Sequence, residues 1–302
     1  MPFMDNLQIL FDAPVLSLQL LIDGLLVGAV FALVAYGMAL VWGVMNIINI
    51  AQGEFVMLGG YTAYFFYKAG IHPLFAIPVA AVILFIFGWA LYRAVIFRVV
   101  DRDLFTSILA TFGLSILLQQ LANQVFGADV HTVQSNLQTW FLFNGMVTVS
   151  QIKVLACVIA LIMGGILLWF LKRSRLGQAI RATAQNARAA RIMGIDTNRV
   201  YAATFGLNAA ICGAAGALVA MIWIIQPYLG LPYTARSFMI VVVAGVGNIG
   251  AVFLAGLGLG IAEEFAGFLL GAQFQTAFVF ALLVLILVWR RVRLSRQRRY
   301  LS

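Results

Sequence analysis

Polar side chains interrupt two otherwise apolar, glycine-rich stretches of the sequence. Residues 45–60 read MNIINIAQGEFVMLGG, and the polar residues within them are Asn46, Asn49, Gln52 and Glu54. Amides and a carboxylate are costly in contact with lipid, so such side chains usually face a bundle interior or a water-filled cavity. There they can exchange hydrogen bonds with a polar or charged solute. These residue types therefore predict solute binding along a translocation path.

The second stretch lies in the last third of the chain, where residues 244–250 read AGVGNIG. Its candidates for the same path are Gly245, Gly247, Asn248 and, further along, Glu263. Interrupted helices in the two halves of a transporter indicate a substrate site, because unwound backbone is tolerated where it lines a cavity. Alternatively, the glycines permit close helix packing and the polar groups bond between helices. The sequence leaves both interpretations open.

No catalytic motif accompanies these residues. The sequence contains no G-x-x-x-x-G-K-[ST] phosphate loop and no Gly-Lys pair, so we do not expect this chain to hydrolyse ATP. His72 and His131 lie in separate connections, far in sequence from Cys157 and Cys212, without the spacing of a metal site. We expect no enzymatic activity, no catalytic residue and no metal or other cofactor on this chain.

The composition determines which elements must position the polar residues. The 302 residues are 64% hydrophobic and 10% charged, whereas a soluble domain has roughly 25% charged residues. Apolar runs such as 104–126 and 152–171 approach or exceed the ~20 residues that cross a bilayer. We therefore predict an all-α polytopic membrane protein, with residues 1–302 forming one transmembrane domain. The net charge of +9 comes from short connections and the C-terminal tail, which indicates membrane topology rather than a nucleic-acid partner.

The distribution of lysine and arginine predicts the orientation. Residues 93–102, residues 172–200 and the tail from Arg290 are basic and are expected in the cytoplasm, whereas the N-terminus and residues 127–150 are expected outside. Clear spans are 19–42, 46–67, 74–92, 104–126, 151–171, 201–224 and 276–290. An even number of crossings must follow residue 200, yet 237–270 is short for two full crossings. The prediction is eight to nine helices, broken near 46–60 and 237–250, with the C-terminus cytoplasmic.

The segment 172–200 holds seven of the nineteen lysine and arginine residues and a single acid. Its pattern predicts a helix from Leu176 to Met193 on which Arg181 and Arg188, seven residues apart, share a face. Gly194 is expected to end this helix, and either Asp196 or Thr197 to cap the next one. A basic stripe beside an alanine face favours docking to a partner protein. A loop that touches only lipid headgroups is the alternative.

Three motifs resemble one family. The run GQAIRATAQNARAARIMGIDTNRVYAATFGLNAAICGAAGALVA resembles the coupling segment of branched-chain amino acid (Liv-type) ABC-transporter permeases and the helix that follows it. NIINIAQGEFVMLGGYTAYF and GVGNIGAVFLAGLGLGIAEE resemble the family's N-terminal signature and its Gly-rich C-terminal region. The resemblance covers about residues 19–290. Two departures are Gln52, where relatives often have His, and the tail WRRVRLSRQRRYLS, which lacks the usual basic-Pro-Gly-Leu ending.

The resemblance implies an import permease of the bacterial inner membrane. Its partners would be two ATP-binding subunits, a second permease subunit that is usually a different chain, a periplasmic binding protein and membrane lipid, with ATP held by the partner subunits. Residues 176–194 would form the coupling helix, and the motif and its polar contacts would be Gly177, Arg181, Ala184, Arg188, Arg191, Gly194 and Asp196. The cargo would be branched-chain or other hydrophobic amino acids, or else urea, short amides or aromatic acids. An ion-coupled secondary transporter that uses Glu54, Glu263 and Glu264 is the rival from another class.

Overall fold

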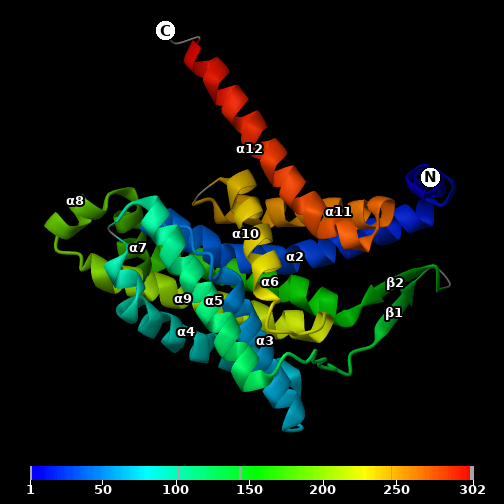
Figure 1. Ribbon diagram of the computed structural model, residues 1–302, viewed down its shortest axis with the longest axis horizontal. Helices are drawn as coiled ribbons and strands as arrows, with labels where there is room; N and C mark the ends of the chain where they lie inside the picture. The colour runs from blue at the N-terminus through cyan, green and yellow to red at the C-terminus, as the bar shows by residue number, and fades with distance from the viewer. Residues whose placement is uncertain (1, 101, 143–144, 246, 300–302) are drawn as a thin grey trace.

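The computed structural model describes residues 2–100, 102–142, 145–245 and 247–299. Figure 1 shows an elongated helical bundle with one small hairpin. In chain order the elements are α1 (Pro2–Asp12), α2 (Pro14–Met45), α3 (Gln52–Lys68), η1 (Pro73–Phe75), α4 (Ala76–Ala94), η2 (Ile96–Arg98), α5 (Leu104–Phe126), β1 (Thr139–Leu142), β2 (Val147–Ser150), α6 (Gln151–Arg173), α7 (Arg175–Gln185), α8 (Ala187–Ile192), α9 (Thr197–Ile222), α10 (Gly230–Ala244), α11 (Ile249–Leu270), η4 (Ala272–Phe274) and α12 (Gln275–Arg299).

Seven helical segments in the described part of the chain are long and apolar enough to cross a membrane. They correspond to α2, α4, α5, α6, α9, α11 and the first part of α12. Adding α3 and the short apolar α10 gives nine helices in the described part of the chain, which agrees with the predicted eight to nine. The all-α polytopic class is therefore confirmed.

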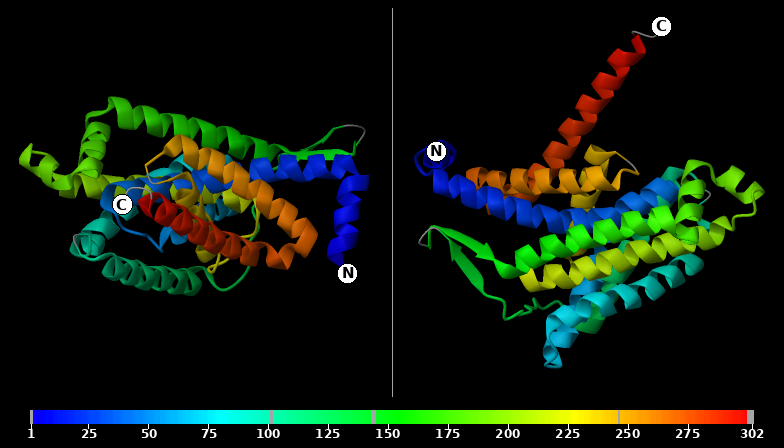
Figure 2. Two further views of the ribbon diagram at one scale, coloured as in Figure 1. Left: turned by 90° about the horizontal axis from the view of Figure 1, so that it is seen from above. Right: turned by 180° about the vertical axis from the view of Figure 1, so that it is seen from behind.

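Helices α2 and α9 form the centre of the bundle. The most apolar windows of these two helices are 89% and 83% buried, whereas the other spans expose most of their surface. Helix α11 packs along α2, and α3 and α4 pack along α9. Figure 2 shows α2, α4, α6 and α9 running side by side, while α12 leaves the bundle after packing against α10 and α11. The exposed apolar faces of the outer helices are suited to lipid.

Glycines allow the central helices to approach one another closely. A Cβ added to Gly28 of α2 would lie 2.6 Å from the carbonyl oxygen of Gly256 on α11. Between α3 and α9, a Cβ on Gly216 would lie 1.9 Å from the carbonyl oxygen of Val56. Such backbone contact is typical of membrane helices, whose association depends on close packing because lipid is as apolar as their side chains.

Gly216→Ala is expected to destabilise the bundle by about 1–3 kcal/mol, because the methyl group can be accommodated only if α3 and α9 move apart. The matched control is Gly258→Ala on α11, whose added methyl group meets nothing within 4 Å. The measurement is the thermal unfolding midpoint of the detergent-solubilised chain. Equal midpoints for the two variants would contradict the packing of α3 on α9.

The first break separates α2 from α3. Asn46 ends α2 in the left-handed conformation, with φ of 53° and ψ of 33°, and regular helix resumes only at Gln52. Ile47, Asn49 and Ala51 within the break are buried, so the unwound backbone lies inside the protein, as a membrane requires. The predicted break near 46–60 is confirmed and lies in its N-terminal part.

The second break separates α10 from α11. Gly245 and Gly247 have φ of 85° and 90°, which ends α10 and turns the chain into α11. At ~1.5 Å per residue the 15 residues of α10 span only about 22 Å, whereas the 22 residues of α11 span about 33 Å. The predicted break near 237–250 is confirmed. Because α10 begins at Gly230, the pair consists of one short helix and one full-length span rather than two shortened spans.

Basic side chains gather at one end of the bundle, and a small β-hairpin lies at the other. Arg93 and Arg98 line the same cavity of about 460 Å³ as Arg199, so the basic connection after α4 and the basic segment before α9 meet at one end, which we call the basic end. The β1–β2 hairpin lies at the opposite end, where Gln19 Nε2 of α2 donates a hydrogen bond to the carbonyl oxygen of Thr148 at 2.9 Å. We call this the hairpin end. The hairpin itself was not predicted from the sequence.

Candidate functional site

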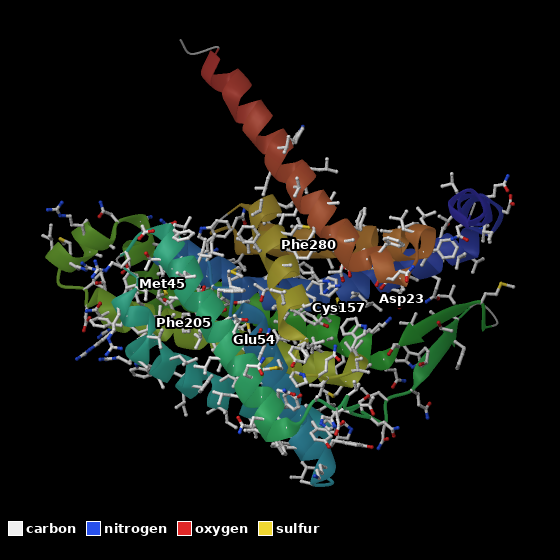
Figure 3. The ribbon with its side chains drawn as sticks, in the orientation of Figure 1. Asp23, Met45, Glu54, Cys157, Phe205 and Phe280 are labelled. Carbon is white, nitrogen blue, oxygen red and sulfur yellow. The ribbon has the colours of Figure 1, made fainter. Side chains whose placement is uncertain are left out.

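Glu54 lies in the first turn of α3, just after the first break, and Figure 3 marks its place in the middle of the bundle. Its side chain is fully buried, and its Oε1 accepts hydrogen bonds from Ser115 Oγ at 2.8 Å and Gln119 Nε2 at 2.9 Å, both on α5. Its other oxygen, Oε2, is buried and has no hydrogen-bond partner among the described residues. The carboxylate therefore joins α3 to α5 and keeps one oxygen available.

The first turn of α10 forms the opposite wall of the buried polar cluster around Glu54. A Cβ on Gly230 would lie 2.5 Å from Glu54 Oε1, so α10 begins directly against the carboxylate. Thr234 Oγ1 accepts a hydrogen bond from the backbone N–H of Gly53 at 2.9 Å and donates one to the carbonyl oxygen of Ile50 at 3.0 Å. A movement of α10 would consequently change the contacts around the Glu54 carboxylate.

Gln52 and Asn49 extend the cluster toward α2 and α9. Gln52 Nε2 donates hydrogen bonds to the carbonyl oxygen of Val34 at 3.0 Å and to Cys212 Sγ at 2.9 Å. Gln52 Oε1 and both amide atoms of Asn49 are buried without partners among the described residues. Native proteins leave few buried polar atoms unbonded, so these atoms hold hydrogen-bonding capacity that the described residues do not use.

The other path candidates lie elsewhere. Asn46 is exposed, and its role in the fold is to end α2. Gly245, Gly247 and Asn248 form the α10–α11 turn, about 22 Å along α10 from Gly230. Asn248 is exposed, and its Oδ1 caps α11 by accepting a hydrogen bond from the backbone N–H of Ala251 at 3.1 Å. The structure therefore brings Asn49, Gln52 and Glu54 together, but not the glycine-rich turn.

Glu263 forms a buried ion pair that the sequence analysis missed. Arg236 Nε donates to Glu263 Oε2 at 2.9 Å, and Nη2 donates to Oε1, while the two side chains are only 13% and 5% exposed. The guanidinium carbon also lies 4.9 Å from the ring centroid of Phe31. A signal was present, because Arg236 is the single lysine or arginine between residues 200 and 289 of an apolar region. No described group of three His, Cys, Asp or Glu residues could hold a metal ion.

The segment predicted as one coupling helix consists of two helices, α7 and α8, at the basic end. The prediction of a continuous helix from Leu176 to Met193 is wrong, because Asn186 is extended, with φ of −159° and ψ of 100°. Its Oδ1 instead caps α8 by accepting from the backbone N–H of Ala189 at 3.0 Å. Seven-residue spacing therefore does not place Arg181 and Arg188 on a shared helical face.

The remaining residues of the segment divide into anchoring and exposed groups. Gly177 is buried where α7 meets α6, and a Cβ there would lie 2.2 Å from the carbonyl oxygen of Phe170. Arg191 Nε donates to Thr197 Oγ1 at 2.6 Å, which ties α8 to α9. Arg181, Ala184 and Arg188 are exposed, and neither arginine has a partner among the described residues.

The two helix-end predictions are confirmed, with Asp196 rather than Thr197 as the cap. Gly194 has φ of 87° and donates its N–H to the carbonyl oxygen of Arg191, which stops the chain after α8. Asp196 Oδ1 accepts from the backbone N–H groups of Asn198 and Arg199, both at 3.1 Å, and so caps α9.

Two apolar side chains project from the end of α8. Ile192 and Met193 are 80% and 81% exposed, and α8 lies at the far extremity of the bundle (Figure 1). Two large apolar residues before a stop glycine in a basic segment are a sequence signal for such a surface, although neither was predicted to be a functional residue. Exposed apolar side chains beside basic residues can contact another protein or the membrane surface. We call this pair the apolar tip.

Comparison with known proteins identifies the family. The chain matches the family described as "Branched-chain amino acid transport system / permease component" over residues 20–288. It is 31% identical to the high-affinity branched-chain amino acid transport system permease protein BraD of Pseudomonas aeruginosa, over 90% of this chain and 94% of that protein. It is 29% identical to LivH of Escherichia coli K12, over 90% and 92% of the two chains, and 27% identical to a probable LivH of Methanocaldococcus jannaschii, over 86% and 85%. No solved structure gives a significant match. The polar break, the glycine-packed spans and the exposed helix pair thus belong to a membrane chain of the branched-chain amino acid transport permease family.

Proposed function

We propose that this chain is the membrane-spanning subunit of an ABC importer that carries branched-chain or other hydrophobic amino acids across a bacterial inner membrane. The observation that carries the proposal is the exposed α7–α8 pair with its apolar tip at the basic end. Because the sequence has no phosphate loop, the energy must come from other chains. The partners are two ATP-binding subunits, which hold the ATP, a second and different permease subunit, and a periplasmic binding protein. The basic end faces the cytoplasm and the hairpin end faces outward.

The same proposal assigns the translocation path to the first break. Asn49, Gln52 and Glu54 offer unbonded polar atoms to the cargo as it passes between α3, α5 and α10. The turn of Gly245, Gly247 and Asn248 acts from a distance, as the hinge on which α10 moves. Asn46 marks the end of α2 where the path begins, and Glu263 belongs to the charged pair on α10 and α11.

Coupling to ATP hydrolysis is proposed to use α7 and α8. Arg181, Arg188 and the exposed face at Ala184 contact an ATP-binding subunit, while Gly177 holds α7 against α6. Arg191, Gly194 and Asp196 fix the segment to the start of α9. Helix α7 also packs against α2 and α9, so a displacement of α7 by a bound partner would move both central helices.

The test reconstitutes the chain with its second permease, its ATP-binding subunits and its binding protein in proteoliposomes. We expect leucine uptake that requires ATP, and a fall of roughly tenfold or more in substrate-stimulated ATP hydrolysis for Arg181→Glu combined with Arg188→Glu, because like charges across an interface are strongly repulsive. The matched control is Arg102→Glu, which reverses a charge in the connection after α4 rather than in α7 or α8.

Two outcomes would contradict the proposal. Uptake by the chain alone under an ion gradient would instead identify a secondary transporter. Unchanged hydrolysis in the Arg181/Arg188 double variant would remove the coupling assignment. ATP-driven uptake of urea or an amide in place of leucine would correct the cargo alone.

A further inference from the structure

A cavity of about 290 Å³ lies near the hairpin end, beside the buried ion pair. It is bordered by α2, α10, α11, the connection after α9 and the start of α12. Its volume is close to the lower limit of small-molecule sites, which begin at roughly 300 Å³. Three charged side chains line it, Arg236, Glu263 and Glu264, together with the aromatic rings of Phe31, Trp223 and Tyr233.

The charges in this cavity are only partly paired. Glu263 engages Nε and Nη2 of Arg236, whereas Nη1 has no hydrogen-bond partner among the described residues. Glu264 is half-buried, and no described residue forms a hydrogen bond or an ion pair with it. The positive charge of Lys153 acts on Glu264, but Lys153 Nζ already pairs with Asp23 Oδ1 at 2.8 Å. The cavity therefore presents one available cationic donor and one available carboxylate.

Aromatic rings flank these two groups. Phe31 and Trp223 stack with their centroids 6.4 Å apart and an interplanar angle of 11°. The guanidinium carbon of Arg236 lies 4.9 Å from the Phe31 centroid and 5.6 Å from the Tyr233 centroid, which fixes the guanidinium from both sides. Adjacent apolar walls and opposite charges are the complement of a small zwitterion that carries an apolar side chain.

We propose that this cavity binds a free α-amino acid with a hydrophobic side chain. The amino acid's carboxylate accepts a hydrogen bond from Arg236 Nη1, its ammonium group donates to Glu264, and its side chain lies against Phe31 and Trp223. Glu263 is a positioning residue, because its two oxygens hold the guanidinium in place. The inference rests on the proposed import function and deepens it, since urea and neutral amides carry neither charge.

The position of the cavity fits a holding site beside the path. Arg236 is six residues after Gly230 on α10, which is about 9 Å along the helix from the wall of the Glu54 cluster. Both sites share α10, so occupation of the cavity and movement at the cluster are mechanically linked.

The test measures binding to the purified complex of the chain with its second permease and ATP-binding subunits, in lipid nanodiscs without the binding protein. Equilibrium dialysis with radiolabelled leucine is expected to show saturable binding. Two competitors test the two charged contacts: 3-methylbutylamine lacks the carboxylate, and 4-methylpentanoate lacks the ammonium group. Each should compete at least tenfold more weakly than leucine, because each loses one charge-assisted hydrogen bond. Urea should not compete.

Variants separate recognition from a structural role. Glu264→Gln should weaken leucine binding at least tenfold. Arg236→Met combined with Glu263→Leu leaves no unpaired buried charge, so the fold and the thermal midpoint should persist while leucine binding is lost. The matched control, Asp23→Asn combined with Lys153→Gln, removes the neighbouring ion pair that does not line the cavity and should retain binding.

The outcomes for the site and for the import function can be told apart. The site would be overturned by the absence of saturable leucine binding, or by either analogue competing as strongly as leucine. Normal leucine binding by the Arg236→Met/Glu263→Leu variant would overturn it as well. The same complexes, assayed in proteoliposomes with the binding protein, report ATP-driven uptake. Uptake without direct binding would remove the site and leave the proposed function intact, whereas binding without uptake would support the site and remove the function.

Discussion

Replacing Ile192 and Met193 together with aspartate is expected to abolish ATP-driven uptake while the chain still folds and enters the membrane. Both side chains are about four-fifths exposed, so the substitutions should change the free energy of unfolding by no more than about 0.5 kcal/mol. If the apolar tip is buried in a groove of an ATP-binding subunit, each side chain contributes roughly 1.5–3 kcal/mol to docking. Losing both would lower the affinity by on the order of a hundredfold or more.

The measurement is the fraction of ATP-binding subunits that co-purifies with the chain, followed by leucine uptake in proteoliposomes. Ile192→Leu combined with Met193→Leu is the matched control, because it keeps the apolar area and should keep both assembly and uptake. Normal co-purification of the double aspartate variant would show that the apolar tip lies outside the interface. Retained assembly with lost uptake would place the tip's role in transmission of movement rather than in docking.

The sequence was sufficient for features that depend on local composition. Apolar runs with few charges predicted the spans, and the polar interruptions predicted the break at Asn46, where the chain adopts a left-handed conformation. The stop at Gly194 and the cap at Asp196 were also predictable, because both depend on backbone geometry within a few residues. Three of the candidate path residues, Asn49, Gln52 and Glu54, lie together because they share one short segment.

Features that depend on long-range packing were not predictable. The partners of Glu54 are Ser115 and Gln119, more than sixty residues away, and the neighbouring wall is Gly230. No local pattern connects these positions. The two glycine-rich stretches looked alike in sequence, yet one is a buried break and the other an exposed turn, because only the first is enclosed by other helices.

The break at Asn186 illustrates a different limit. Asparagine fits both the interior of a polar helix and the cap of a new one, and the alanines on either side favour helix in both cases. In the structure, Asn186 caps α8 by accepting from the backbone N–H of Ala189, and this cap requires an extended backbone at Asn186. The periodicity of the charges did not reveal this extended residue. The consequence is that Arg181 and Arg188 belong to different helices, which allows each to contact a different part of a partner.

Glu54→Gln is expected to reduce leucine uptake by about ten- to a hundredfold without destabilising the chain. The amide oxygen of glutamine can still accept from Ser115 Oγ and Gln119 Nε2, so the link between α3 and α5 persists. The substitution removes the negative charge at Oε2, the buried oxygen that has no partner among the described residues. A hydrogen bond to a charged group contributes about 1.5–3 kcal/mol, which corresponds to the expected fall in uptake.

The result decides between the two interpretations of the polar stretch. The matched control is Gln119→Leu, which removes one donor from the carboxylate and leaves its charge, so stability should fall by about 1–3 kcal/mol while uptake per folded complex changes little. If Glu54 serves only to bond α3 to α5, Glu54→Gln should transport normally and Gln119→Leu should be the more damaging change. If the carboxylate contacts the cargo, the order is reversed, because stability then depends on the hydrogen bonds and transport on the charge. Thermal midpoints and initial uptake rates, measured on the same two preparations, distinguish these orders.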